Sequence, residues 1–354
     1  MHLAHWSIAQ TKNRETKAEG IGWELFLNYR IARDKYKPDF FLYENNKSMS
    51  PAIREQITAE LGVEPILINS SLMSAQNRQR LYWLGKRNPD GTYSQVVVEQ
   101  PVDRGILLRD ILESGVCWKE KGYALLSTTG GTTAEDMVYR HQRNGVAEPV
   151  AIKPLTEREM DYSVTLCGNG GGLGAKTGLY TVPVIPDGKG QCVIKAAGEN
   201  EITVYEVRGG FITIKGKTYP IKLADGFYII RKLTVTECKR LQTVPDTYAF
   251  PVSDTQAYKM LGNGWTVDVI AHIMSHFDGL TEETVEVLSM YDGMSCGHIA
   301  LDKLGVTITT YYATEIDKYA IQTTQHNFPN TVQLGDAFQV RDPAWCLPRK
   351  EENL

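Results

Sequence analysis

One stretch near the carboxyl end of the sequence limits the folds available to this chain. A strand-like run over 285–291 leads into the turn Asp292-Gly293-Met294-Ser295-Cys296-Gly297, and a helical pattern follows over 298–304. A glycine-bearing turn at the carboxyl end of a parallel strand lets a ligand approach backbone amides at a helix N-terminus. The pattern predicts an open, mostly parallel α/β sheet with a ligand site at this edge.

Acidic residues end the next two strand-like runs. Glu315 follows the run over 307–313 and lies about 22 positions after Gly293, where nucleotide-type folds place a ribose-binding carboxylate. Asp336 follows the run over 331–334 and could accept a hydrogen bond from an adenine amino group. A plain turn followed by two solvated strand-end acids is the alternative, and this stretch alone leaves both open.

The pattern of residue types divides the chain into three parts. Residues 1–99 and 231–354 alternate helix-like and strand-like runs, whereas 100–230 is rich in glycine and in alternating β-branched residues. We therefore expect one α/β domain interrupted by a mostly β insertion at 100–230. Within 1–99 we expect buried parallel strands over 40–43, 65–68 and 80–84 and helices over 23–29 and 53–61. Strands over 201–205 and 211–214, a flexible glycine loop over 168–174, and helices over 234–241 and 268–276 complete the expectation.

Composition excludes several classes of protein. With 354 residues, 42% hydrophobic and 23% charged, the chain is globular and large enough for two domains. No apolar run reaches the roughly 20 residues of a membrane span. The six cysteines form no CxxC pair, so neither a zinc site nor a disulfide framework is indicated. A net charge of -4 means that any nucleic-acid surface must be local.

Seven motifs together resemble those of the cytosine-C5 DNA methyltransferases. The turn 291–297, Thr314-Glu315-Ile316-Asp317 and Gly335-Asp336-Ala337 resemble the three cofactor motifs of that family. Glu44-Asn45-Asn46 resembles its catalytic glutamate motif, and Gln76-Asn77-Arg78-Gln79-Arg80 its Gln-x-Arg-x-Arg motif. The stretch 231–246 resembles the motif that follows the target-recognition domain, and Gly262-Asn263-Gly264 resembles the opening of the last helix.

The resemblance implies a fold, a cofactor and a set of site residues. The fold is a Rossmann-like S-adenosylmethionine-dependent methyltransferase sheet with an inserted, mostly β target-recognition domain. Glu44 is the acid that protonates the target ring, with Arg78 and Arg80 beside it as a clamp, because residues i and i+2 face one side of a strand. The implied S-adenosylmethionine contacts are Tyr291, Asp292, Gly293, Met294, Ser295, Cys296, Gly297, Glu315, Ile316, Asp336, Ala337, Asn263 and Gly264. No metal is implied, and Cys296 is interpreted as a packed small residue.

Two departures from the family pattern stand out. The catalytic motif precedes the cofactor motifs here, so the chain is interpreted as circularly permuted, with 277–284 as the link. The family nucleophile lies in a Pro-Cys loop after the fourth strand. Counting back from Ser7 places Leu3 at the cysteine position and His2 at the proline position. Cys346 follows no apolar strand and is not accepted as the nucleophile.

The sequence therefore predicts a DNA (cytosine-5-)-methyltransferase scaffold that acts on double-stranded DNA in the cytoplasm of a bacterium or a phage-infected cell. Three alternatives stay open: a split enzyme whose fourth strand and Pro-Cys loop come from another polypeptide, a truncated gene, and a catalytically inactive DNA- and cofactor-binding protein. The basic residues expected to face DNA are Arg78, Arg80, Lys86 and Arg87 near the catalytic edge, with Arg104 and Arg109 at the entry to the insertion. The target sequence cannot be read from 100–230.

Overall fold

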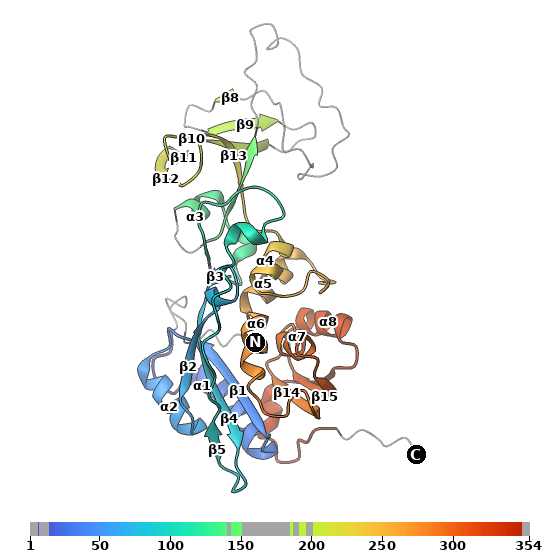
Figure 1. Cartoon of the computed structure of the whole chain (residues 1–354). Coiled ribbons are helices and arrows are strands. Elements are labelled where there is room, and N and C mark those ends of the chain that lie inside the picture. Colours follow the sequence, from blue (N-terminus) through green and yellow to red (C-terminus); the bar gives the residue numbers. More distant parts are fainter. Residues whose placement is uncertain are drawn as a thin grey trace.

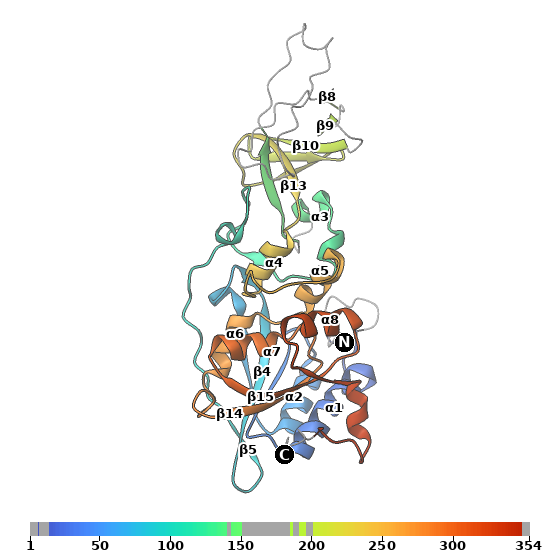
Figure 2. The same ribbon diagram turned by 90° about the vertical axis from the view of Figure 1, so that its right-hand side faces the viewer.

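The computed structural model describes Trp6 and residues 14–139, 143–150, 185–186, 191–195 and 201–348. An α/β body carries two sheets and most of the helices, and a β-rich part projects from one end of it (Figures 1 and 2). Within the described residues, no helix is both long and apolar enough to cross a membrane. The predicted loop 168–174 and the positions His2, Leu3 and Ser7 lie outside the described residues.

The first sheet of the body contains the catalytic motif. Its strands are β1 (Phe40–Asn46), β4 (Gln79–Arg87) and β2 (Pro65–Asn69) in that order, with β5 (Tyr93–Gln95) paired to β4. Both β1 and β2 pair with β4 in the antiparallel sense. β1 and β2 therefore run in the same direction, and the expectation that the strand over 80–84 is parallel to them is wrong. β4 follows β2 in the chain and lies between β1 and β2 in the sheet. Helices α1 (Gly20–Tyr36) and α2 (Pro51–Leu61) pack on this sheet through Trp23, Phe26, Ile53 and Ile57.

The second sheet contains the predicted glycine turn. It is parallel, in the order β14 (Thr284–Met290), β15 (Thr307–Thr314) and β16 (Val332–Gly335). Helices α7 (Cys296–Lys303) and α8 (Lys318–Asn327) connect these strands. The strand-turn-helix prediction for 285–304 is confirmed, and the two acids end β15 and β16 as expected.

The insertion forms a separate antiparallel sheet. Its described order is β12 (Lys217–Pro220), β11 (Phe211–Ile214), β10 (Glu201–Arg208), β13 (Gly226–Arg231) and β7 (Val146–Val150). Off this path, β9 (Gln191–Lys195) pairs with β10, and β8 (Ile185–Pro186) pairs with β9. Its own apolar cluster includes Val207, Ile212 and Ile230. Earlier residues of the predicted insertion, among them Leu108 and Leu125, pack instead in the main core. The short elements between are β3 (Gln76–Asn77), β6 (Gly122–Tyr123), α3 (Ala134–Val138) and 3-10 turns at Ser70–Leu72, Leu108–Ile111 and Thr129–Gly131.

The segment after the insertion ties the β sheet to the body. Thr234 caps α4 (Val235–Leu241), and the buried carboxylate of Glu237 accepts a hydrogen bond from the Thr234 amide in a capping box. Arg231 Nη1 and Nη2 each donate to Glu237. Two further helices, α5 (Asp254–Asn263) and α6 (Val267–Met274), follow. The expectation that Gly262-Asn263-Gly264 opens a helix is corrected: Asn263 ends α5, and α6 begins at Val267.

Candidate active site and cofactor pocket

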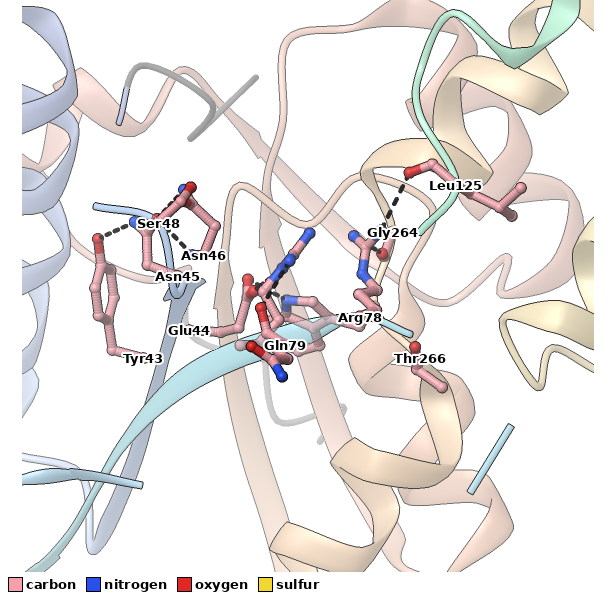
Figure 3. Close-up of polar contacts among 12 residues, drawn as sticks. Tyr43, Glu44, Asn45, Asn46, Ser48, Arg78, Gln79, Leu125, Gly264 and Thr266 are labelled. Atoms are coloured by element: carbon pink, nitrogen blue, oxygen red, sulfur yellow. Dashed lines mark hydrogen bonds and ion pairs between the residues drawn. The ribbon is translucent and has the colours of Figure 1, made fainter. Parts of the chain in front are cut away.

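Glu44 lies at the carboxyl end of β1, and both oxygens of its carboxylate have partners (Figure 3). Arg80 Nε lies 2.9 Å from Oε1, and Trp265 Nε1 donates to Oε2 at 3.0 Å. These partners come from β4 and from the segment before α6, so two distant parts of the chain fix one side chain. Charge-assisted bonds of this kind hold a carboxylate in one orientation. Glu44 is therefore a fixed acidic group facing a cavity.

Arg78 and Arg80 have different surroundings, although both belong to the same motif. Arg78 lies between β3 and β4, is 5% exposed, and donates to the backbone carbonyls of Leu125 and Gly264 at 3.3 and 2.9 Å. Burial lowers the pKa of Arg78 to about 9. Its guanidinium thus joins the insertion's first segment to the end of α5, whereas Arg80 alone reaches Glu44.

The turn after β14 adopts an unusual backbone. Tyr291, Gly293 and Ser295 have φ values of 60°, 62° and 56°. This left-handed conformation is sterically strained for the two residues that are not glycine. A Cβ atom at Gly293 would meet nothing within 4 Å, so the space in front of the turn is open. The backbone amide of Gly293 faces Glu315 and donates to its Oε2 at 3.0 Å.

Glu315 is 3% exposed, and backbone amides fix its carboxylate. Besides Gly293, the amides of Ile316 and Asp317 donate to Oε1 at 2.7 and 2.8 Å. Beside it, the apolar Ile316 side chain is 49% exposed. A buried carboxylate next to an exposed apolar side chain suits the ribose and base of a nucleoside.

The carboxylate of Asp292 accepts hydrogen bonds from two side chains at the turn. Tyr311 Oη donates to its Oδ1 at 2.8 Å, and Ser295 Oγ donates to its Oδ2. Burial raises the pKa of Asp292 to about 6. Ser295 Oγ also contacts Thr324 of α8. These contacts show that Asp292 and Ser295 hold the turn in shape through their side chains.

One cavity of about 2110 Å³ is lined both by the segment around Glu44 and by the turn around Gly293. Of the residues named from the sequence, its lining includes Glu44, Arg78, Arg80, Asn263, Gly264, Tyr291, Asp292, Gly293, Met294, Cys296, Gly297, Glu315 and Ile316. Ser295, Asp336 and Ala337 are not in the lining. Asp336 accepts from the amide of Phe338 at 3.0 Å and so caps the 3-10 helix Ala337–Arg341, and Ala337 is buried. Sequence reasoning missed Trp265, whose only signal was its place after Gly264.

The cysteines whose side chains the structure describes, Cys117, Cys238, Cys296 and Cys346, offer no thiolate beside Glu44. Cys296 lines the cavity, but burial raises the pKa of its thiol to about 12, so it stays protonated. This agrees with its interpretation as a packed residue. Cys238 is buried, Cys117 belongs to the insertion, and Cys346 lies beside Tyr36 near the start of β1. Rejecting Cys346 as a nucleophile agrees with this placement.

The basic residues are distributed differently from the expectation. Arg80 opposes Asn46 at the site end of β1, whereas Lys86 opposes Phe40 at the other end. Lys86 and Arg87 therefore lie far along β4 from Glu44, and their predicted place near the catalytic edge is wrong. Lys86 pairs with Asp278, Arg87 with Asp39, Arg104 with Asp268 and Arg109 with Asp110. Two exposed lysines line the cavity, Lys37 before β1 and Lys47 directly after it. Lys47 is the one at the site end of β1, where its Nζ donates to Gln79 Oε1 at 2.8 Å.

A parallel sheet with a glycine turn, a strand-end carboxylate and an acid in one cavity defines a Rossmann-like α/β protein of the S-adenosylmethionine-dependent methyltransferase class. Residues 4–278 match the family model for the C-5 cytosine-specific DNA methylase. The chain belongs to this family, whose methyl donor is S-adenosylmethionine.

Individual relatives are more distant. The chain is 28% identical to the type II methyltransferase M.HpaII of Haemophilus parainfluenzae, over 70% of this chain and 62% of that protein. It is 26% identical to M.NlaX of Neisseria lactamica, over 67% and 62%. The chain thus spans less than two thirds of the length of either relative. Among solved structures, a methyltransferase of Entamoeba histolytica aligns with a TM-score of 0.35 and 14% identity, over 72% of this chain and 67% of that one.

Proposed function

We propose that this chain is the scaffold of a DNA (cytosine-5-)-methyltransferase that acts on a cytosine flipped out of double-stranded DNA. The observation that carries the proposal is the shared cavity: Glu44 and the turn at Gly293 line the same space. A methyl donor and a cytosine ring must meet for transfer, and one continuous cavity permits this. Flipping is needed because the reacting atoms are inaccessible in a stacked duplex.

The residues present fit S-adenosylmethionine. The open space before Gly293, the fixed carboxylate of Glu315 and the exposed Ile316 side chain form a cradle for a nucleoside. We assign the ribose to Glu315 and the base to Ile316, with Tyr291, Asn263 and Gly264 around them. Asp336 is the proposed acceptor for the adenine amino group. It is absent from the cavity lining, but its charge acts on the hydroxyl of Tyr291, which lines the cavity. When bound, the cofactor supplies an electrophilic methyl group.

Glu44 supplies the acid chemistry. A cytosine ring in the cavity would receive a proton on N3 from the Glu44 carboxyl group, which makes C6 electrophilic. A thiolate then adds to C6, and C5 becomes nucleophilic enough to take the methyl group. Loss of the C5 proton and of the thiol restores the aromatic ring. Arg80 and Trp265 hold the acid in position for this step.

The thiolate is expected from outside the described residues. We propose that it is delivered by a complementing polypeptide that carries a strand and a Pro-Cys loop. The proposal includes circular permutation, which is supported by the family match ending at residue 278 while the cofactor-type motifs follow it. It also includes the division into residues 1–99, 100–230 and 231–354, with target recognition in the middle part, and a cytoplasmic location where DNA is available.

A catalytically inactive protein that binds DNA and cofactor is the second candidate, favoured by the lack of a reactive thiol among the described side chains. One experiment tests S-adenosylmethionine binding, which both candidates require. Another distinguishes the enzyme scaffold from the inactive binder. Calorimetric titration with S-adenosylmethionine should show binding, whereas ATP, the control nucleotide, should not bind. Absence of S-adenosylmethionine binding would contradict both candidates. Methyl transfer after complementation separates an enzyme scaffold from an inactive binder.

A further inference from the structure

Two segments that lie far apart in the chain line the proposed cofactor end of the cavity. One is the end of α5, which contributes Lys259 and Asn263 to the lining. The other is the turn from β15 to α8, which contributes Glu315, Ile316 and Asp317. Lys259 and Asn263 are four residues apart, so they lie on the same face of α5. Lys259 therefore lies one helical turn before the asparagine that the proposed function places beside the cofactor.

An ion pair joins these two segments. Lys259 Nζ lies 2.7 Å from Asp317 Oδ2, and among the described salt bridges this is the one that connects α5 with the turn from β15 to α8. The side chain of Lys259 is 40% exposed and that of Asp317 is 25% exposed, whereas Glu315 is 3% exposed. Water and salt therefore reach the ion pair more readily than they reach the Glu315 carboxylate.

Asp317 also bonds within its own segment. Its Oδ1 accepts a hydrogen bond from the Tyr319 amide at 3.0 Å and so caps the N-terminus of α8. The backbone amide of Asp317 donates to Glu315 Oε1 at 2.8 Å. Because Lys259 and the helix cap each fix one oxygen of the Asp317 carboxylate, together they fix the direction of this amide. Two contacts thus lead from Lys259 through Asp317 to the Glu315 carboxylate.

The other lysine beside Asp317 has different surroundings. Lys318 is exposed, and its ammonium group lies over the Tyr319 ring, 5.0 Å from the ring centroid. It does not line the cavity, and none of the described salt bridges includes it. Lys318 therefore offers a matched control, because it places a positive charge next to Asp317 without contacting the cofactor segments.

We infer that Lys259 is a positioning residue for S-adenosylmethionine, which acts through Asp317 to hold Glu315 and Ile316 in place. This inference rests on the proposed function, which assigns the ribose to Glu315 and the base to Ile316. Without the ion pair, the Asp317 carboxylate keeps one of its two anchors, and the turn gains conformational freedom. Binding of the nucleoside must then remove that freedom, which lowers the affinity.

Calorimetric titration of the full chain with S-adenosylmethionine is the test. Lys259→Met keeps the apolar stem and removes the charge, and it should weaken binding about two- to fivefold, as expected for a half-exposed ion pair. Asp317→Asn should give a similar loss, because the amide oxygen still caps α8. The double variant should lose no more than either single variant. Lys259→Arg should bind like the unmodified chain, and the control Lys318→Met should leave the affinity unchanged.

Two further measurements distinguish the ion pair from other causes. Salt screens exposed charges, so the difference between the unmodified chain and Lys259→Met should shrink from about 0.1 to 1 M sodium chloride, whereas a packing defect would persist. Methylthioadenosine keeps the ribose and the base and lacks the amino-acid part of the cofactor, so Lys259→Met should weaken its binding by the same factor. Equal binding of methylthioadenosine to both proteins would place Lys259 against the amino-acid part and overturn the inference.

The remaining outcomes are equally decisive. Thermal unfolding confirms that each variant is folded, and Asp317→Asn provides the comparison if Lys259→Met fails to fold. Unchanged S-adenosylmethionine affinity in the single variants, or additive losses in the double variant, contradicts the positioning role alone. Failure of the unmodified chain to bind S-adenosylmethionine contradicts the proposed function and this inference together.

Discussion

The indole Nε1 of Trp265 donates to the Glu44 carboxylate at 3.0 Å, although 221 residues separate the two in the chain. This bond links the strand that carries the acid to the segment between α5 and α6, which also borders the cofactor turn. Arg80 holds the other oxygen of the same carboxylate. The orientation of the acid is therefore coupled to the cofactor side of the cavity through Trp265.

A double-mutant cycle should detect this bond. Trp265→Phe and Glu44→Gln, alone and together, should give a coupling of about 1–2 kcal/mol in the free energy of unfolding, because the bond involves a charged acceptor. Urea unfolding measures each protein. A second cycle pairing Trp265→Phe with Glu282→Gln, an exposed and distant glutamate, should give coupling within about 0.5 kcal/mol. Equal coupling energies in both cycles would show that the bond between Trp265 and Glu44 adds nothing to the free energy of unfolding.

Glu315→Ala should weaken S-adenosylmethionine binding. The substitution removes a charged acceptor and the bonds that fix the Gly293 and Ile316 amides, so we expect a loss of roughly 1.5–3 kcal/mol, or about 10- to 150-fold in affinity. Calorimetric titration measures the affinity, and thermal unfolding confirms that the variant is folded. Glu282→Ala is the matched control. Unchanged affinity in Glu315→Ala would remove this carboxylate from the cofactor site.

Asp292 should make stability depend on pH. Its pKa is raised by burial from 3.8 to about 6, so between these values the folded state binds more protons than the unfolded state. The free energy of unfolding therefore falls as the pH rises through this window, by on the order of 2–3 kcal/mol. Asp292→Asn should lack this contribution. Urea unfolding of both proteins from pH 4 to 7 is the measurement, and a constant difference between them would contradict the prediction.

The sequence pattern predicted the strand-turn-helix over 285–304, because neighbouring residues determine this part of the fold. The strand, turn and helix over 285–304 are contiguous, and their apolar spacing and glycine were sufficient. The antiparallel placement of β4 was not accessible in this way, because a buried strand has the same composition in either direction and only its pairing with Leu42 and Leu67 decides.

The candidate site was predictable in its residue types and not in its contacts. Glu44 and Arg80 were named, and the ion pair between them joins neighbouring strands. The pattern gave no sign that Arg78 is buried against carbonyls of Leu125 and Gly264, since backbone partners leave no sequence signature. Trp265 was missed for the same reason: its partner is remote in the chain.

DNA binding should be salt-sensitive, and the sensitivity should depend on which end of the first sheet carries the charge. Lys47 is exposed, lines the cavity and follows the site end of β1, whereas Lys86 lies at the far end of the sheet and pairs with Asp278. A lysine that contacts a phosphate releases a counterion, so Lys47→Ala should lower the slope of log affinity against log salt by about 1. Lys86→Ala should leave it unchanged. Fluorescence anisotropy with duplex DNA measures the slopes, and reversed effects would place DNA on the other end of the sheet.

Methyl transfer itself is the most demanding prediction. We expect the chain alone to transfer no methyl group to DNA, because the cysteines whose side chains the structure describes offer no thiolate beside Glu44 and cytosine C5 is too weak a nucleophile without addition at C6. A polypeptide that supplies the strand and the Pro-Cys loop should create activity. Incorporation of tritiated methyl groups into unmethylated genomic DNA is the assay.

The complemented activity should require Glu44. Glu44→Gln cannot protonate N3, and acid catalysis of this kind contributes about 10²–10⁴-fold, so incorporation should fall by that factor. Leu3→Cys in the uncomplemented chain should help little, because a thiol without its strand is not aimed at the ring. Robust incorporation by the unmodified chain would overturn the account of the nucleophile. A complemented chain that binds cofactor and DNA yet stays inactive would favour the inactive binder, because binding without turnover is what that alternative requires.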